Sequence, residues 1–146
     1  MKRNFKRSMS VIVAGVMLAM CLGVAAFAFP QDATVVFYQV GTTTPSMANG
    51  VINGTPQYDT NTLTIPLKTL TIYGQTSQLT ALSVNFGGTV TDAVIYDDNA
   101  DGVNDRAVLT LPSSATPGGT YPAQVTNALV GHAGGNPANV DFYFDY

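Results

Sequence analysis

The chain is a succession of short segments in which apolar and polar side chains alternate. The clearest is 140–146, where Phe142 and Phe144 share one parity and Asp141 and Asp145 have the other. Successive side chains of a β-strand point to opposite faces, so this alternation predicts a strand with one buried face. After the first thirty residues no window repeats apolar residues with the period of 3.6 that an amphipathic helix needs. The chain is therefore expected to fold as β-structure.

Similar segments recur along the chain, separated by turns rich in glycine and proline, such as Thr116-Pro117-Gly118-Gly119. About seven short strands spaced in this way predict an all-β, immunoglobulin-like β-sandwich of about 7–8 strands. Residues 29–146 contain no linker or internal repeat and are expected to form one domain. The predicted strands are Ala33–Val40, Thr62–Ile72, Leu79–Phe86, Thr91–Tyr96, Arg106–Leu111, Tyr121–Leu129 and Val140–Tyr146.

The N-terminus has the pattern of a secretory signal peptide. Four of the six basic residues lie in the first seven positions, the apolar run Val11–Val24 follows, and Ala26-Phe27-Ala28 has small residues at positions −3 and −1 of a cleavage site. No basic flank follows the apolar run, so a retained membrane anchor is the weaker alternative. Met20 stands before Cys21 where a lipoprotein signal needs a small residue. Residues 1–28 are thus predicted to be removed, which makes the protein extracellular, either released or attached to the cell surface, with no membrane span and no disulfide.

The charge of the remaining chain excludes some classes of partner. Beyond residue 28 the only basic residues are Lys68 and Arg106, against nine aspartates and no glutamate, a net charge of −7. Nucleic-acid binding requires a basic surface that neutralises phosphates. Nucleic acid is therefore not an expected partner.

An acidic loop between two predicted strands has the spacing of a calcium site. It follows the pattern D-x-N-x-D-G-x-x-D, which places oxygen ligands at positions 1, 3, 5, 7 and 9 and Gly102 at the sharp bend. Position 12 is Val108, so the bidentate glutamate of a helix–loop–helix site is absent, and the loop resembles the calcium-loaded β-hairpin loops of integrin-like extracellular repeats. A solvated turn is the alternative. The predicted ligands are the side chains of Asp97, Asn99, Asp101 and Asp105 and the carbonyl of Val103.

Few residues of this chain are of the types that catalysis uses. Residues 29–146 contain one histidine, His132, and neither cysteine nor glutamate, and no serine lies in a nucleophile-elbow motif. The protein is therefore expected to bind a ligand and not to be an enzyme.

Several short motifs stand in order along the chain. They are Val35–Tyr38, Pro45–Gly50, Leu63–Leu67, Ile72–Leu82, the hairpin Asp92–Leu111 and the closing strand Asn139–Tyr146. Taken together, these segments resemble the near-iron transporter (NEAT) haem-binding domains of Gram-positive bacteria. This resemblance implies an immunoglobulin-like sandwich that captures or relays haem at the cell surface, with haem or haem-carrying surface proteins as partners.

The resemblance also implies roles for individual residues. Ser46 and Met47 match the short helical lip over the haem, where the serine binds a propionate and the methionine packs on the porphyrin. The tyrosine that usually ligates the iron has no counterpart in residues 129–139. His132 lies near that place and is the candidate axial ligand, with the Met47 thioether as an alternative. The motifs alone also allow two simpler interpretations. Ser46 and Met47 would then form a polar turn with a packing methionine, and His132 would be a histidine of a surface loop.

Two other functions fit the same pattern. A calcium-stabilised structural or adhesive module without haem would keep the sandwich and its acidic loop. A carbohydrate-binding module would use exposed aromatic side chains, and the absence of tryptophan counts against it. Tyr143, which shares its parity with Asp141 and Asp145, is expected to face outward on the last strand.

Overall fold

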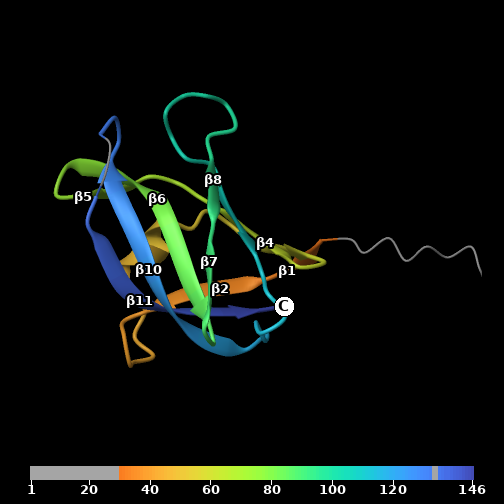
Figure 1. Cartoon of the computed structure of the whole chain (residues 1–146). Coiled ribbons are helices and arrows are strands. Elements are labelled where there is room, and N and C mark those ends of the chain that lie inside the picture. The colour runs from red at the N-terminus through yellow and green to blue at the C-terminus, as the bar shows by residue number, and fades with distance from the viewer. Residues whose placement is uncertain (1–29, 133–134) are drawn as a thin grey trace, which may run out of the picture.

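The computed structural model describes residues 30–132 and 135–146 (Figure 1). The predicted signal peptide, residues 1–28, lies outside the described residues. None of the helical structure within those two ranges is long and apolar enough to cross a bilayer.

Within the described residues the chain forms eleven strands and one 3-10 helix, η1 (Met47–Val51). The strands are β1 (Gln31–Asp32), β2 (Thr34–Tyr38), β3 (Gln57–Asp59), β4 (Thr62–Pro66), β5 (Leu70–Ile72), β6 (Gln75–Phe86), β7 (Thr89–Asp92), β8 (Val94–Tyr96), β9 (Arg106–Thr110), β10 (Gly119–Leu129) and β11 (Pro137–Asp145).

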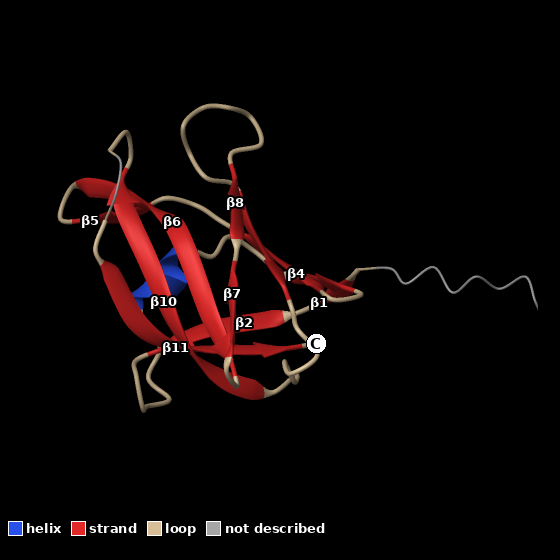
Figure 2. Cartoon of the chain, in the orientation of Figure 1, coloured by secondary structure: helices blue, strands red, loops and turns tan. Residues whose placement is uncertain are grey.

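These strands form two antiparallel sheets (Figure 2). Sheet 1 has the order β1-β3-β4-β9-β8, and sheet 2 has the order β2-β11-β10-β6-β5, with β7 paired to β6. The apolar faces of the two sheets share one buried core. The predicted β-sandwich is therefore confirmed, with more strands than the sequence pattern suggested and with β6, β10 and β11 longer than predicted.

The largest fully buried side chains of the core are aromatic residues of sheet 2. Phe142 and Phe144 of β11 are fully buried, as the alternation predicted, and Phe37 of β2 and Phe86 of β6 lie against them. The ring centroids of Phe37 and Phe142 are 5.8 Å apart, and Phe86 meets Phe142 edge-on at 6.4 Å. Such tilted contacts add to the free energy that burial of the ring areas contributes.

The segment predicted as one strand over Thr62–Ile72 is two strands in different sheets. β4 ends at Pro66 in sheet 1, and β5 begins at Leu70 in sheet 2. At the crossing, the Leu67 N–H donates to the carbonyl of Asp105 at 2.7 Å. The apolar residues change parity between Leu67 and Leu70, and a strand that continued would turn Leu70 away from the core.

The segment predicted as Thr91–Tyr96 is divided in the same way. β7 ends at Asp92 in sheet 2, and β8 begins at Val94 in sheet 1. Between them the Ala93 N–H donates to the carbonyl of Leu82 at 2.8 Å. The chain segment formed by β7 and β8 thus passes from sheet 2 to sheet 1.

Truncation of the central aromatic residue tests the packing. We expect Phe142→Ala to lower the free energy of unfolding by about 3–5 kcal/mol, because it leaves a cavity where rings of β2 and β6 meet. Denaturant unfolding followed by circular dichroism measures the loss. Val94→Thr, at a side chain 54% exposed, is the matched control and should stay near the parent. Equal losses in the two variants would contradict the assigned core.

Candidate functional site

The 3-10 helix η1 is attached to the free edge of β2. Phe37 of this edge strand turns its backbone N–H and C=O away from β11, and the Asn49 side chain binds both groups. The Asn49 Oδ1 accepts from the Phe37 N–H at 2.8 Å, and the Asn49 Nδ2 donates to the Phe37 carbonyl at 2.6 Å. The Ser46 N–H donates to the same carbonyl at 2.7 Å. An unpaired strand edge is thereby satisfied, and η1 is held beside sheet 2.

The orientation of η1 exposes Met47. Ser46 is the N-cap, and its hydroxyl oxygen accepts from the Ala48 N–H at 3.3 Å. Ala48 and Val51 are buried in the core, whereas Met47 is 70% exposed. At the place where the resemblance implied a lip, the chain therefore forms a short helix with one buried face and an exposed thioether.

A basic side chain lies next to the end of η1. The Lys68 N–H donates to the Val51 carbonyl at 2.8 Å, which holds this exposed lysine beside the helix. The other basic residue of the described ranges, Arg106, is committed elsewhere: its Nε lies 2.8 Å from Asp98 Oδ2 and its guanidinium lies over the Tyr96 ring. Lys68 is thus the cation available to a ligand near η1.

His132 lies on the β10–β11 hairpin, just beyond the last residue of β10. It is exposed, and its N–H donates to the Leu129 carbonyl at 2.9 Å. Leu129 pairs with Ser77, Ser77 pairs with Leu70, and the Leu70 side chain packs so closely on Gly50 of η1 that an added Cβ would lie 2.8 Å from it. No hydrogen bond among the described residues links His132 to Ser46 or Met47.

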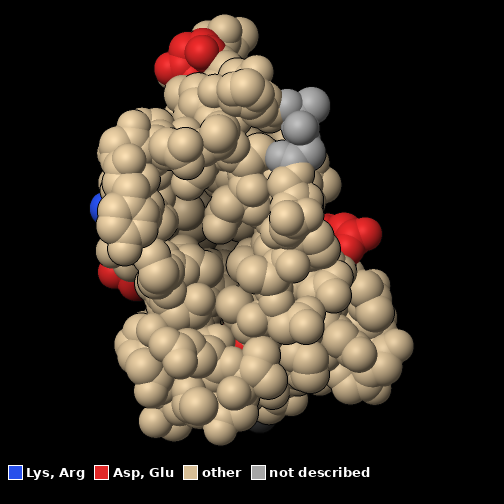
Figure 3. All heavy atoms as spheres, turned by 90° about the vertical axis from the view of Figure 1, so that its left-hand side faces the viewer, with Lys and Arg blue, Asp and Glu red and all other residues tan. Residues whose placement is uncertain are grey.

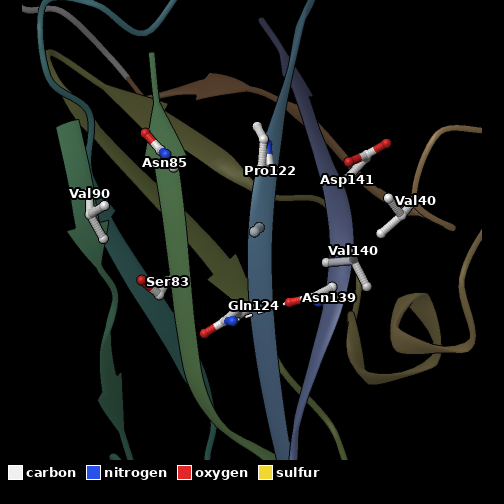
Figure 4. Close-up of a pocket in the computed structure, with 10 residues that line it drawn as sticks. Val40, Ser83, Asn85, Val90, Pro122, Gln124, Asn139, Val140 and Asp141 are labelled. Atoms are coloured by element: carbon white, nitrogen blue, oxygen red, sulfur yellow. Dashed lines mark hydrogen bonds between the residues drawn. The ribbon is translucent and has the colours of Figure 1, made fainter. Parts of the chain in front are cut away.

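A groove crosses the outer face of sheet 2 (Figure 4). Its volume is about 460 Å³, and it runs over β6, β10 and β11 between Val40 on one side and Val90 on the other. Five of its ten lining residues are polar and five are apolar. The lining residues used below are Ser83, Asn85, Pro122, Gln124, Asn139 and Asp141.

Sequence reasoning missed this groove. The outward parity of Asp141 and Tyr143 was visible in the alternation of the last strand. The sequence contained no signal that β11 would lie between β2 and β10, because strand order is decided by long-range pairing. Tyr143 does face outward as predicted, with its ring centroid 6.2 Å from that of Tyr38 on β2.

The acidic loop between β8 and β9 is organised by its own backbone. The Asp97 carboxylate accepts from the N–H groups of Asp101 at 3.2 Å and Gly102 at 2.8 Å, and the Asn99 Oδ1 accepts from Asp101 at 3.0 Å. The Asp101 carboxylate accepts from the Val103 N–H at 2.8 Å. A hydrogen bond from the Arg106 guanidinium lowers the pKa of Asp98 below its usual value. Asp105 accepts from the Asp98 N–H at 2.8 Å.

This loop is also fixed to sheet 2 through the buried side chain of Gln78 on β6. Its Nε2 donates to the Gly102 carbonyl at 3.1 Å, and its Oε1 accepts from the Asn104 N–H at 2.8 Å. The Asn104 Nδ2 donates to the Leu79 carbonyl at 2.7 Å. Among the described residues no three His, Cys, Asp or Glu side chains form a group that could hold a metal ion. Calcium at this loop therefore has no support from the side-chain geometry and stays a prediction.

Comparison with known proteins places the fold. No family profile matches the chain, and no curated protein matches it. Among solved structures, the NEAT5 domain of IsdX2, a B. anthracis hemophore in complex with heme, aligns with a TM-score of 0.52 at 14% identity over 81% of this chain and 96% of that one. A mutant of the same domain in complex with heme aligns equally well, over 95% of its chain. The fold of this chain is thus NEAT-like.

The bond between η1 and β2 can be tested at one residue. We expect Asn49→Ala to lower the free energy of unfolding by about 1–3 kcal/mol, because it removes the acceptor of the Phe37 N–H and one of the two donors to the Phe37 carbonyl. Chemical denaturation is the measurement. Asn53→Ala is the control, since Asn53 is exposed and bonds only through its backbone N–H. Equal stabilities of the two variants would contradict the role assigned to Asn49.

The calcium prediction has a thermal test. Calcium at several times its dissociation constant should stabilise the protein by about 1 kcal/mol, and chelation should lower the melting temperature accordingly. Asp101→Asn should abolish the difference, whereas Asp145→Asn, outside the loop, should retain it. A melting temperature indifferent to chelation would leave the loop as a turn satisfied by its backbone hydrogen bonds.

Proposed function

We propose that this protein binds haem at the lip formed by η1, with His132 on the neighbouring hairpin as the candidate axial ligand. The observation that carries the proposal is the position of Met47. Its thioether is exposed on a helix that Asn49 holds against the edge of a NEAT-like sandwich. A polarizable thioether in a defined position suits a flat apolar macrocycle.

The donor groups near η1 fit the chemistry of haem. A porphyrin needs apolar cover, hydrogen-bond donors for two propionate carboxylates, and a nitrogen, sulfur or oxygen ligand for iron. Ser46 uses its oxygen as an acceptor in the N-cap and keeps its hydroxyl hydrogen for a carboxylate. Lys68 supplies a positive charge beside the helix in a domain that is otherwise strongly acidic. His132 or Met47 supplies the ligand atom.

Each residue has a separate part in the proposed binding. Ser46 and Lys68 would bind the propionates, Met47 would give the porphyrin apolar cover and exclude water, and His132 would supply a ring nitrogen for the iron. Bound haem supplies the iron, and the protein supplies its capture and orientation. The proposed function is the binding and relay of haem, not catalysis. The predicted signal peptide would place the protein outside the cell, where haem-carrying surface proteins would be its partners.

A haemin titration of the purified protein tests the proposal. We expect a saturable, red-shifted Soret band at one equivalent of haemin. His132→Ala should bleach or shift that band, because the axial ligand is lost. Met47→Leu keeps the apolar volume and removes the sulfur, so an altered band in this variant would identify the thioether as the ligand.

Thr64→Ala, on the outer face of sheet 1, is the control and should leave the spectrum unchanged. A spectrum that matches free haemin at all ratios would refute haem binding. An unchanged band in His132→Ala would remove His132 and leave the rest of the proposal standing.

A further inference from the structure

The groove on sheet 2 is separate from the proposed haem site. It is lined by residues of β6, β10 and β11 and by Val40 and Val90, and none of Ser46, Met47, Lys68 or His132 belongs to it. Figure 4 shows the polar side chains rising from three adjacent strands between the two valines. Its volume of about 460 Å³ is in the range of small-ligand sites. What it binds must therefore be argued from its own chemistry.

The floor of the groove carries oriented amide groups. The Gln124 Nε2 donates to the Asn139 Oδ1 at 3.1 Å, which orients both side chains across β10 and β11. The Asn85 Oδ1 accepts from the Gly88 N–H at 2.7 Å, which orients a third amide on β6. Within the described residues, these bonds leave the amide nitrogens of Asn85 and Asn139 as donors and the Gln124 oxygen as an acceptor. The Ser83 hydroxyl, which can do both, lies beside them.

The charge of the groove excludes anionic ligands. No lysine, arginine or histidine lines it, and its one carboxylate, Asp141, already accepts from the Gly41 N–H at 2.7 Å. Uncharged side chains cover most of the face seen in Figure 3, the side on which β11 lies. A phosphate, a uronic acid or a haem propionate would meet no countercharge here. The uncharged amides and hydroxyl of the floor suit an uncharged ligand that both donates and accepts hydrogen bonds.

Two aromatic side chains, outside the lining of the groove, lie on the same face of sheet 2 close to Asp141. Tyr38 of β2 pairs directly with Asp141, and its ring lies 6.2 Å from that of Tyr143. Partial desolvation, with the charge of Asp145, raises the pKa of the Tyr143 phenol above its usual value, which keeps this phenol neutral. Neutral aromatic rings beside a row of amides combine a surface for C–H groups with partners for hydroxyls.

We propose that the outer face of sheet 2 binds a neutral β-1,4-linked glycan chain, with Gln124 and Asn139 bonding its hydroxyls and Tyr38 and Tyr143 contacting a sugar ring at one end. Each sugar hydroxyl donates and accepts, as the mixed amide floor requires. A ribbon-like chain also matches an open groove that runs across several strands. A peptide that added to a sheet would use the backbone of an edge strand instead, whereas here the side chains of central strands face the ligand.

Titration with defined oligosaccharides tests this proposal. Cellohexaose and N-acetylchitohexaose are the neutral probes, oligogalacturonate of the same length is the anionic probe, and a neutral hexapeptide is the competitor. Isothermal calorimetry on the whole purified protein gives the affinities. We expect saturable binding of at least one neutral glycan, at least tenfold weaker in Gln124→Ala and in Asn139→Ala. Thr64→Ala on the opposite sheet should bind like the parent.

Surface substitutions at Gln124 and Asn139 should leave the fold intact, which circular dichroism verifies for each variant. Tyr143→Ala should weaken binding, and Tyr143→Phe should retain it, because the contact is made by the ring. Failure of both neutral glycans to bind would overturn the proposal, as would tighter binding of oligogalacturonate, displacement by the hexapeptide, or an affinity unchanged in the groove variants. The haemin titration is independent of each of these results.

Discussion

The packing of Phe142 and Phe144 against Phe37 and Phe86 is the contact on which the rest of the structure depends. These rings lie on β11, β2 and β6, which come from the two ends and the middle of the described chain. Their burial holds β11 between β2 and β10. Because side chains alternate along a strand, burial of one residue of β11 places the next residue on the outer face of the sheet. Asn139, Asp141 and Tyr143 therefore reach the outer face because Val140, Phe142 and Phe144 fill the core.

The edge of sheet 2 shows how a local need for hydrogen bonds shapes a candidate site. β2 would present unpaired backbone groups at Phe37, and the Asn49 amide takes the place of a neighbouring strand. The same contact places η1, and the burial of Ala48 and Val51 then leaves Met47 exposed. The position of η1 is thus a consequence of closing a sheet edge, and the Met47 thioether is exposed because η1 buries only the face that carries Ala48 and Val51.

Much of the fold could be predicted from alternation alone. The buried residues of the last strand, the strand character of most segments and the sandwich class all follow from a period of two. The crossings at Leu67 and Ala93 were missed because the sheet that a strand joins depends on distant partners, although the change of parity between Leu67 and Leu70 is a local sign of the first crossing. The short strands β1 and β3 lack an apolar run and exist through pairing with each other and with β4. The acidic loop was recognised as a loop, but its attachment to Gln78 required a contact between residues far apart in the chain.

The sequence by itself determined that this chain is a β-sandwich and which residues its strands bury. It also determined that the side chains of residues 29–146 that could act on a ligand include one histidine, several aspartates and many neutral polar groups. These properties are local, because strand periodicity and side-chain chemistry need no knowledge of neighbours. Only the tertiary structure decided that Met47 would be exposed, that Lys68 would lie at the C-terminal end of η1, and that amides of β6, β10 and β11 would line one groove. It alone also brought Tyr38 and Tyr143 together. The physical reason is that sites arise from strand order and edge closure, which are decided by contacts between distant parts of the chain.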